Sequence, residues 1–294
     1  MDVARELWSR FETLHAVTYF GEETTAAGRA AGMSGFWMGY FGFRAAPLGA
    51  VGAAAVEATF FNFAPAFVAR WVPDVWQHAT PEALVLDRSE AAAETLVRVF
   101  PSIAEVAAQL NNAFRRATER GFGAGRPLFA ANRSLALPDD PVAALWQLCT
   151  TLREHRGDGH VAALTAAGLD GIEAHVMIAL ERGSDPEDLQ VTRGWSADDW
   201  AEAVGRCRAR GLVDDKANLT DQGCALRQEV EATTDRLAMA VWGNTTRMYH
   251  DRLVELLTPA AEAVSRSGVI RYPNPIGLPP LHEKDHQGTE RKRS

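Results

Sequence analysis

Residues 211–223 read GLVDDKANLTDQG, and this stretch decides the fold that the sequence predicts. An apolar pair at 212–213, a polar turn and a second pair at 219–220 form the pattern of a short β-hairpin. A long helix with apolar side chains at helical spacing is expected to follow over 222–242. Two helices precede the hairpin, so the order of elements is helix, turn, helix, hairpin and long helix. That order is typical of a winged helix-turn-helix.

The wider sequence strengthens this interpretation through a family resemblance. Residues 206–235, RCRARGLVDDKANLTDQGCALRQEVEATTD, resemble the recognition-helix end, wing and following helix of MarR-type regulators. From residue 5 to about 265 the chain resembles an actinobacterial MarR-like helix-turn-helix family, in the motifs GFWMGYFGFRAAPLG, FFNFAP and LREHRGDGHVAAL. The resemblance implies a winged-helix fold, and it implies no substrate, cofactor or catalytic residue.

Helical patterns dominate the rest of the chain, so the predicted fold class is mainly α. Two helix-turn-helix-like halves are expected, the second of them a winged helix with a small β-hairpin. The predicted divisions are an aromatic-rich half at 1–125, a connector at 126–141, the winged-helix half at 142–271 and a disordered tail at 272–294.

Internal similarity raises the possibility of a duplication. When residues 7–36 are aligned with 145–172 across a two-residue gap, AGMSGF (31–36) falls on AGLDGI (167–172). The alternative is chance, because Ala and Gly are common in this chain. A duplication would make the chain a fused pseudo-dimer with a ligand cleft between two unlike halves.

Several element boundaries follow from local signals. Residues 35–46 carry aromatic side chains on every side, which predicts a buried helix or the lining of a cavity. Residues 52–71 are expected to form one helix, and 184–194 a loop. A helix at 142–155 is expected to end before a new helix that Asp158 caps.

Composition bounds the function. The chain has 294 residues, of which 47% are hydrophobic and 23% charged, as in a globular protein with a large core. No apolar run is long enough to span a membrane, and the first residues lack the pattern of a signal peptide. Three scattered cysteines suit a reducing cytoplasm, which is the predicted location. A net charge of −8 argues against a broad nucleic-acid footprint.

The stretch LREHRGDGHVAAL, residues 152–164, supplies the main candidate site. One interpretation is a capped surface helix with solvated ion pairs. The other is a polar site with an acid/base histidine, an orienting carboxylate and arginines that bind an anion. The catalytic candidates are His155, His160, Glu154 and Asp158, and the anion-binding candidates are Arg153 and Arg156. A metal site is disfavoured, since His155 and His160 are five residues apart rather than four.

A second set of candidates comes from the aromatic half. Arg44 lies in an apolar segment and needs a partner if it is buried. The predicted ligand-binding residues here are Arg44, His15, Tyr19, Trp37, Tyr40 and Asn62, although such an aromatic run is more often core. No cofactor is predicted. Haem, with His15, His160 or His175 as axial ligand, and a metal remain minor alternatives.

DNA binding is possible but disfavoured by charge. The end of the recognition helix that should lead into the groove holds Ser196, Asp198, Asp199 and Glu202. Residues 191–236 contain seven Arg or Lys and nine Asp or Glu, so this segment is not basic. Carboxylates at that position would face phosphate, which is unfavourable.

Two hypotheses of function follow. The first is a small-molecule-binding protein of regulator type, with an anionic or aromatic ligand in the cleft between the halves. The alternative is an enzyme on a repurposed winged-helix scaffold, in which REHRGDGH performs lyase, isomerase or cyclase chemistry. The expected state is a monomer or homodimer without a membrane partner.

Overall fold

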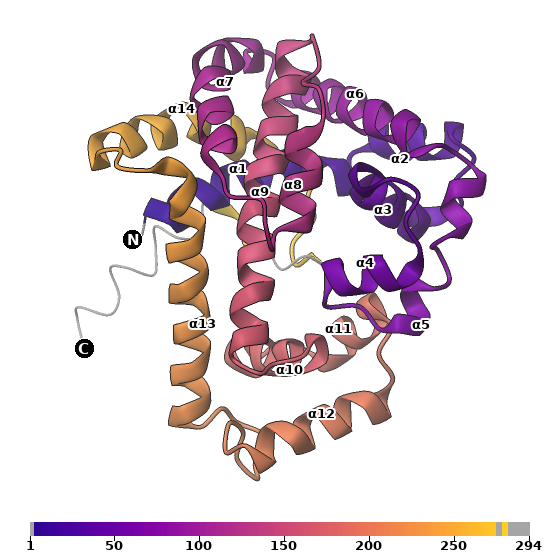
Figure 1. Cartoon of the computed structure of the whole chain (residues 1–294), viewed down its shortest axis with the longest axis vertical. Coiled ribbons are helices and arrows are strands. Elements are labelled where there is room, and N and C mark those ends of the chain that lie inside the picture. The colour runs from indigo at the N-terminus through magenta and orange to yellow at the C-terminus, as the bar shows by residue number, and fades with distance from the viewer. Residues whose placement is uncertain (1–2, 275–277, 282–294) are drawn as a thin grey trace.

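The computed structural model describes residues 3–274 and 278–281, and within them the chain is a bundle of helices (Figure 1). The predicted fold class, mainly α, is confirmed, because no strand occurs in these described ranges. The elements are α1 (Val3–Phe20), α2 (Glu22–Ala30), α3 (Gly35–Ala45), η1 (Ala46–Leu48), α4 (Ala53–Phe60), α5 (Pro65–Val68), η2 (Asp74–Gln77), α6 (Pro81–Val99), α7 (Ile103–Arg120), α8 (Pro127–Ser134), α9 (Pro141–Ala166), α10 (Gly171–Arg182), α11 (Pro186–Arg193), α12 (Ala197–Ala209), α13 (Asp221–Met239), η3 (Ala240–Trp242) and α14 (Arg247–Arg266).

The larger of two hydrophobic cores surrounds the first half of α9. Helices α1, α6, α7 and α8 pack against α9, and α14 packs along α1. Trp146 of α9 and Phe41 of α3 are completely buried in this core. Both predicted halves of the chain therefore contribute to one core.

The smaller core holds the helix-turn-helix at one end of the molecule (Figure 1). It joins α10 and α12 to the end of α9 and the start of α13, around Ile172, Trp200 and Val230. Helices α11 and α12 are separated by residues 194–196 only, and Gly194 has a φ of 76°. This short turn with a left-handed glycine is the geometry of a helix-turn-helix.

The predicted β-hairpin is replaced by a tight turn. In the described part of the chain Val213 and Leu219 form an isolated antiparallel bridge and no ladder. The carboxylate of Asp214 accepts hydrogen bonds from the backbone N–H groups of Lys216 (2.9 Å) and Asn218 (2.8 Å). These side-chain bonds close the turn in place of further strand pairing.

The structure does not support the predicted duplication. Residues 7–36 contain most of α1, all of α2 and the start of α3, whereas 145–172 lie mainly in the single helix α9. The similarity of AGMSGF to AGLDGI reflects a helix C-cap, in which Gly32 and Gly168 both have positive φ. Gly211 follows α12 in the same way, so a glycine of this kind recurs at helix ends in this chain and does not by itself support a duplication.

Asp158 does not begin a helix, contrary to the prediction. Helix α9 runs unbroken from Pro141 to Ala166, and Gly157 and Gly159 lie inside it and not at a helix end. A methyl group at Gly159 would lie 2.8 Å from Nη1 of Arg126 and 3.4 Å from Cβ of Leu237. Gly159 therefore packs closely against the end of the Arg126 side chain and makes an ordinary contact with Leu237 of α13.

Three other boundaries differ from the sequence-based expectation. The expected helix over 52–71 is split into α4 and α5, because Phe61 has a positive φ of 63°. The expected loop at 184–194 contains α11, which Asp185 caps through the backbone N–H of Glu187. The expected connector at 126–141 contains α8.

Part of the predicted disordered tail is described. Within 272–274 and 278–281, the side chain of Leu278 is only 3% exposed and joins the large core. Asn274 accepts a hydrogen bond from the backbone of Leu278 at 3.0 Å. The remainder of this predicted tail, residues 275–277 and 282–294, lies outside the described residues.

Within the described residues, no helix taken singly has the length and apolar composition needed to cross a membrane. Helices α9 and α10 pass that test only as a pair, bent by 97°.

Candidate functional site

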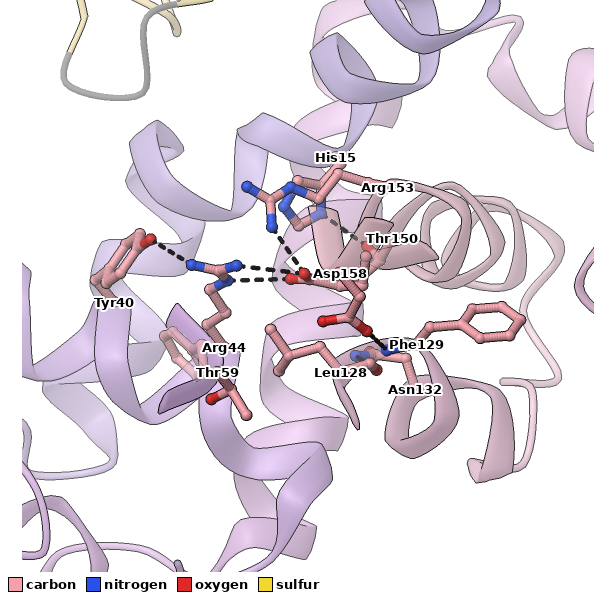
Figure 2. Close-up of polar contacts among 12 residues, drawn as sticks. His15, Tyr40, Arg44, Thr59, Leu128, Phe129, Asn132, Thr150, Arg153 and Asp158 are labelled. Carbon is pink, nitrogen blue, oxygen red and sulfur yellow. Dashed lines mark hydrogen bonds and ion pairs between the residues drawn. The ribbon is translucent and has the colours of Figure 1, made fainter. Parts of the chain in front are cut away.

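A buried ion cluster joins α3 to α9. Nε and Nη2 of Arg44 donate to the two carboxylate oxygens of Glu154 at 3.1 and 3.3 Å, and Nη1 of Arg153 donates to the second oxygen at 2.8 Å (Figure 2). The side chain of Glu154 is 2% exposed and that of Arg44 is 10% exposed. The predicted partner of Arg44 is therefore a carboxylate of α9, and the polar and aromatic segments meet at this contact.

The cluster extends toward α1. Nε of Arg153 donates to Glu12 at 3.3 Å, and Nη1 of Arg44 donates to the hydroxyl of Tyr40 at 3.0 Å. Burial by itself would raise the pKa of Glu154. The charges of Arg153 and Arg44, with the hydrogen bonds from Arg44, instead lower this pKa to about 2. Glu154 is therefore ionised at neutral pH and acts as the anion between two cations.

The imidazole of His15 lies between Thr150 of α9 and Tyr19 of its own helix, α1. Its Nδ1 lies 2.9 Å from Oγ1 of Thr150 and its Nε2 lies 2.9 Å from the hydroxyl of Tyr19 (Figure 2 draws the first of these contacts). Burial, and then the charge of Arg153, lower the pKa of His15 well below its usual value. The imidazole is therefore neutral, and one nitrogen donates while the other accepts.

Asp158 and His155 face α8. Oδ2 of Asp158 accepts the backbone N–H of Phe129 at 2.8 Å, so this carboxyl group caps α8 from a different helix (Figure 2). Burial raises the pKa of Asp158 to about 7. The ring of His155 packs edge-on to Phe129 at 4.8 Å, and burial with the nearby Arg126 lowers its pKa to about 3.

Arg156 and His160 face α13 instead. Nη2 of Arg156 donates to Asp235 at 3.0 Å, and its guanidinium lies over the ring of Trp8. Nδ1 of His160 lies 2.9 Å from Oγ1 of Thr234, and burial lowers its pKa to about 4. The ionisable residues of 153–160 thus divide among four helices that pack on α9, namely α1, α3, α8 and α13. They do not form one catalytic group, and a catalytic role for them stays a prediction.

A pocket of about 160 Å³ lies between α1, α2 and α3. It is not between the two predicted halves. Two predicted ligand-binding residues, Tyr19 and Tyr40, line it, whereas Arg44 and His15 lie behind them. The other lining residues are Thr18, Thr24, Thr25, Gly28, Arg29, Met33, Gly35, Phe36, Gly39 and Phe43.

Two threonines of the pocket, Thr18 and Thr24, differ from other helical threonines in the hydrogen bonding of their hydroxyl groups. For comparison, the hydroxyl groups of Thr13 and Thr25 donate to backbone carbonyls one turn back, as threonine in a helix commonly does. The hydroxyl oxygens of Thr18 and Thr24 are buried and have no hydrogen-bond partner in the described parts of the chain. Both residues line the pocket, so each hydroxyl is a candidate partner for a bound molecule.

Sequence reasoning missed these threonines, although one signal pointed to the pocket. Gly35 and Gly39 lie four residues apart and therefore share a face of α3. A methyl group at Gly39 would meet no atom within 4 Å, so the glycine leaves a hollow on that face.

Trp37 and Asn62 belong to a separate contact, between the aromatic layer and the helix-turn-helix. The ring of Trp37 packs edge-on to Phe67 at 5.2 Å, and Nε1 of Trp195 donates to the backbone oxygen of Asn62 at 3.1 Å. A methyl group at Gly194 would lie 2.3 Å from Cβ of Phe67. The turn between α11 and α12 thus lies directly against Phe67 of α5, and Trp37 of α3 packs against the same ring.

The described residues add no support for the two minor alternatives, a haem group or a metal ion. The described residues hold no group of three His, Cys, Asp or Glu that could bind a metal ion. None of the three histidines considered for haem, His15, His160 and His175, lines the pocket.

The outer face of α12 is acidic at the end that would enter a groove. Asp198 and Glu202 are exposed, and Asp199 forms a capping box with Ser196. The arginines at the far end bind the protein itself: Arg206 donates to Asp170 at 2.7 Å, and Arg210 to the oxygen of Gly168 at 2.6 Å.

The geometry of α11 and α12 agrees with the comparison to known families. A family model described as a helix-turn-helix family matches residues 4–271. The chain belongs to this helix-turn-helix family. Neither the curated proteins nor the solved structures contain a significant match.

Proposed function

We propose that this member of the helix-turn-helix family is a ligand-binding regulator of MarR type, with the ligand held in the pocket between α1, α2 and α3. One observation supports the proposal above others: α3 serves both sites. Phe36 and Tyr40 line the pocket, and Trp37 and Phe41 pack against Phe67 under the helix-turn-helix.

The two faces of α3 give a route by which a ligand could affect α12. A molecule between Tyr40 and α2 would shift α3 relative to its neighbours. The layer beneath Gly194 is closely packed, and packed interiors transmit displacement instead of absorbing it. Ligand affinity and the position of α12 would then be coupled, and the coupling would be reciprocal.

The electrostatics favour a protein whose DNA affinity is weak. The exposed Asp198 and Glu202 would face phosphate groups, while Arg206 and Arg208 of α12 and Arg210 just after it donate to other parts of the protein. DNA therefore remains a disfavoured partner, and a monomer or homodimer remains the expected state. The cysteines Cys149, Cys207 and Cys224 are free, which supports the proposed location in a reducing cytoplasm.

A pocket-filling variant tests ligand binding. A Cβ atom at Gly39 would meet no other atom within 4 Å, so Gly39→Phe is designed to direct a ring into the hollow, whereas Gly39→Ala should leave most of the space open. Single-ring aromatic compounds should raise the melting temperature of the wild type and Gly39→Ala but not that of Gly39→Phe. Compounds that stabilise all three proteins equally would bind elsewhere and contradict the proposal.

Hydrogen–deuterium exchange tests the coupling to the helix-turn-helix. A stabilising compound should change the exchange of residues 193–209 in the wild type and leave Gly39→Phe unchanged. A band-shift assay at low salt, with DNA from the protein's own promoter region, measures whether the same compound alters any retardation.

A further inference from the structure

The inner wall of the pocket consists of two tyrosines whose hydroxyls connect to the buried core. The ring centroids of Tyr19 and Tyr40 are 5.0 Å apart, and the two residues are 6% and 8% exposed. Behind them, the hydroxyl of Tyr19 meets Nε2 of His15 and the hydroxyl of Tyr40 meets Nη1 of Arg44. The pocket therefore has a polar inner end, and its remaining walls combine apolar side chains with Thr18, Thr24, Thr25 and Arg29.

The direction of one of these hydrogen bonds is fixed. A guanidinium can only donate, so the oxygen of Tyr40 accepts from Arg44. The hydroxyl hydrogen of Tyr40 then remains to be donated, and it has no acceptor in the described portions of the chain. The inner end thus offers a donor that a bound molecule can satisfy.

The charge behind the tyrosines is positive. Arg44 and Arg153 share Glu154, and Arg153 also meets Glu12. A third buried cation, Arg88, has no carboxylate within ion-pair distance in the described structure. It donates to uncharged acceptors, namely the backbone oxygen of Phe43 (2.8 Å), Oδ1 of Asn132 (2.9 Å) and Oε1 of Gln147 (3.0 Å). An excess of buried cations stabilises a partially or fully negative oxygen placed nearby.

We infer that the pocket takes a molecule with one aromatic ring, or an apolar body of that size, whose inner end is a carbonyl or enolate oxygen that accepts from Tyr40. The inference rests on the proposed function, since it specifies the ligand of the same site. A volume of about 160 Å³ is close to the ~150 Å³ cavity that holds benzene in an engineered protein. An ammonium group at the inner end is disfavoured by the charge of Arg44 behind Tyr40.

Three fluorinated probes of similar shape test this inference by ¹⁹F NMR titration. They are 4-fluoroacetophenone, 1-fluoro-4-isopropylbenzene and 1-(4-fluorophenyl)ethylamine, which present a carbonyl, a hydrocarbon and an ammonium group. We expect the ketone to bind about 3- to 10-fold more tightly than the hydrocarbon, as one additional hydrogen bond contributes. The amine should bind more weakly than either.

Variants assign the preference to the pocket. Tyr40→Phe keeps the ring and removes the hydroxyl, so the ketone should lose its advantage over the hydrocarbon. Gly39→Phe should abolish binding of every probe. If Tyr40→Phe does not fold, the order of affinities in the wild type, together with Gly39→Phe, still decides the matter.

The possible failures are distinguishable. If the hydrocarbon or the amine binds as tightly as the ketone, or if Tyr40→Phe keeps the ketone's advantage, the inference is wrong while binding in the pocket stands. If no probe binds, or if binding survives Gly39→Phe, the inference and the proposed function both fail.

Discussion

Two buried carboxylates, Glu154 and Glu173, each bind two arginines, but the arginines differ in their surroundings. The side chains of Arg44 and Arg153, which bind Glu154, are 10% and 16% exposed. Those of Arg206 and Arg210, which bind Glu173, are 45% and 35% exposed. The first group lies inside the large core, and the second lies at the edge of the helix-turn-helix, where water screens it.

The comparison shows that the same residue types have different energetic roles in the two regions. Breaking a buried pair leaves a charge without a partner in a medium of low dielectric constant. Breaking an exposed pair returns the arginine to water at little cost. We therefore expect the large core to depend on its ion cluster and the helix-turn-helix to depend on packing and capping.

Glu154→Gln should give the largest effect, because it leaves Arg44 and Arg153 buried without their shared anion. We expect a loss of about 3–5 kcal/mol in the free energy of unfolding, measured by urea denaturation at pH 7. A loss below about 1 kcal/mol would show that water reaches the cluster.

The pH dependence provides a check on this first variant. The pKa of Glu154 in the folded protein, about 2, lies below its ordinary value, so its contribution is complete above about pH 4.5. That contribution is lost as the pH falls toward 2. The stability difference between wild type and Glu154→Gln should therefore narrow over this interval and stay constant above it.

Asp158→Asn should give the next largest effect, and this effect depends on pH. The pKa of Asp158 is raised to about 7 in the folded protein, so the unfolded chain loses this proton near pH 4 while the folded protein keeps it up to about pH 7. Relative to Asp158→Asn, the wild type should therefore lose on the order of 2 kcal/mol between pH 5 and pH 7, and the difference should stay nearly constant at higher pH. Thermal melts across this range measure the difference, and parallel curves for the two proteins would contradict the prediction.

Glu173→Gln is the matched control for Glu154→Gln and should cost about 1 kcal/mol or less. Glutamine can keep the capping bond to the backbone of Asp170, while the exposed ion pairs to Arg206 and Arg210 contribute little. Urea denaturation under the same conditions gives the direct comparison. Equal losses for the two glutamine variants would remove the distinction between the regions.

Asp198→Lys combined with Glu202→Lys should have the smallest effect on stability, within about 0.5 kcal/mol, because both side chains are exposed. The change should increase retardation of DNA in a low-salt band-shift assay, and higher salt should reverse it. Unchanged retardation would show that the acidic face of α12 is not what limits DNA affinity.

Much of the candidate site could be predicted only as separate parts. The need of Arg44 for a partner followed from its apolar flanks, but the identity of Glu154 did not, since 110 residues separate them. The pocket was missed because Thr18 and Thr24 are ordinary helix residues whose unsatisfied hydroxyls become evident only in three dimensions. The prediction that Asp158 caps the helix following it in sequence was wrong, because its carboxylate caps the start of α8 instead.

The sequence by itself determined the helical class and the positions of α12 and α13, because hydrophobic periodicity, caps and glycine turns act within a few residues. Tertiary structure alone decided which face of α9 meets which neighbouring helix. It also decided that the arginines around Glu154 are buried and that those around Glu173 are exposed. The reason is physical: the strength of a charge interaction depends on the water and the chain around it, and residues distant in sequence supply both.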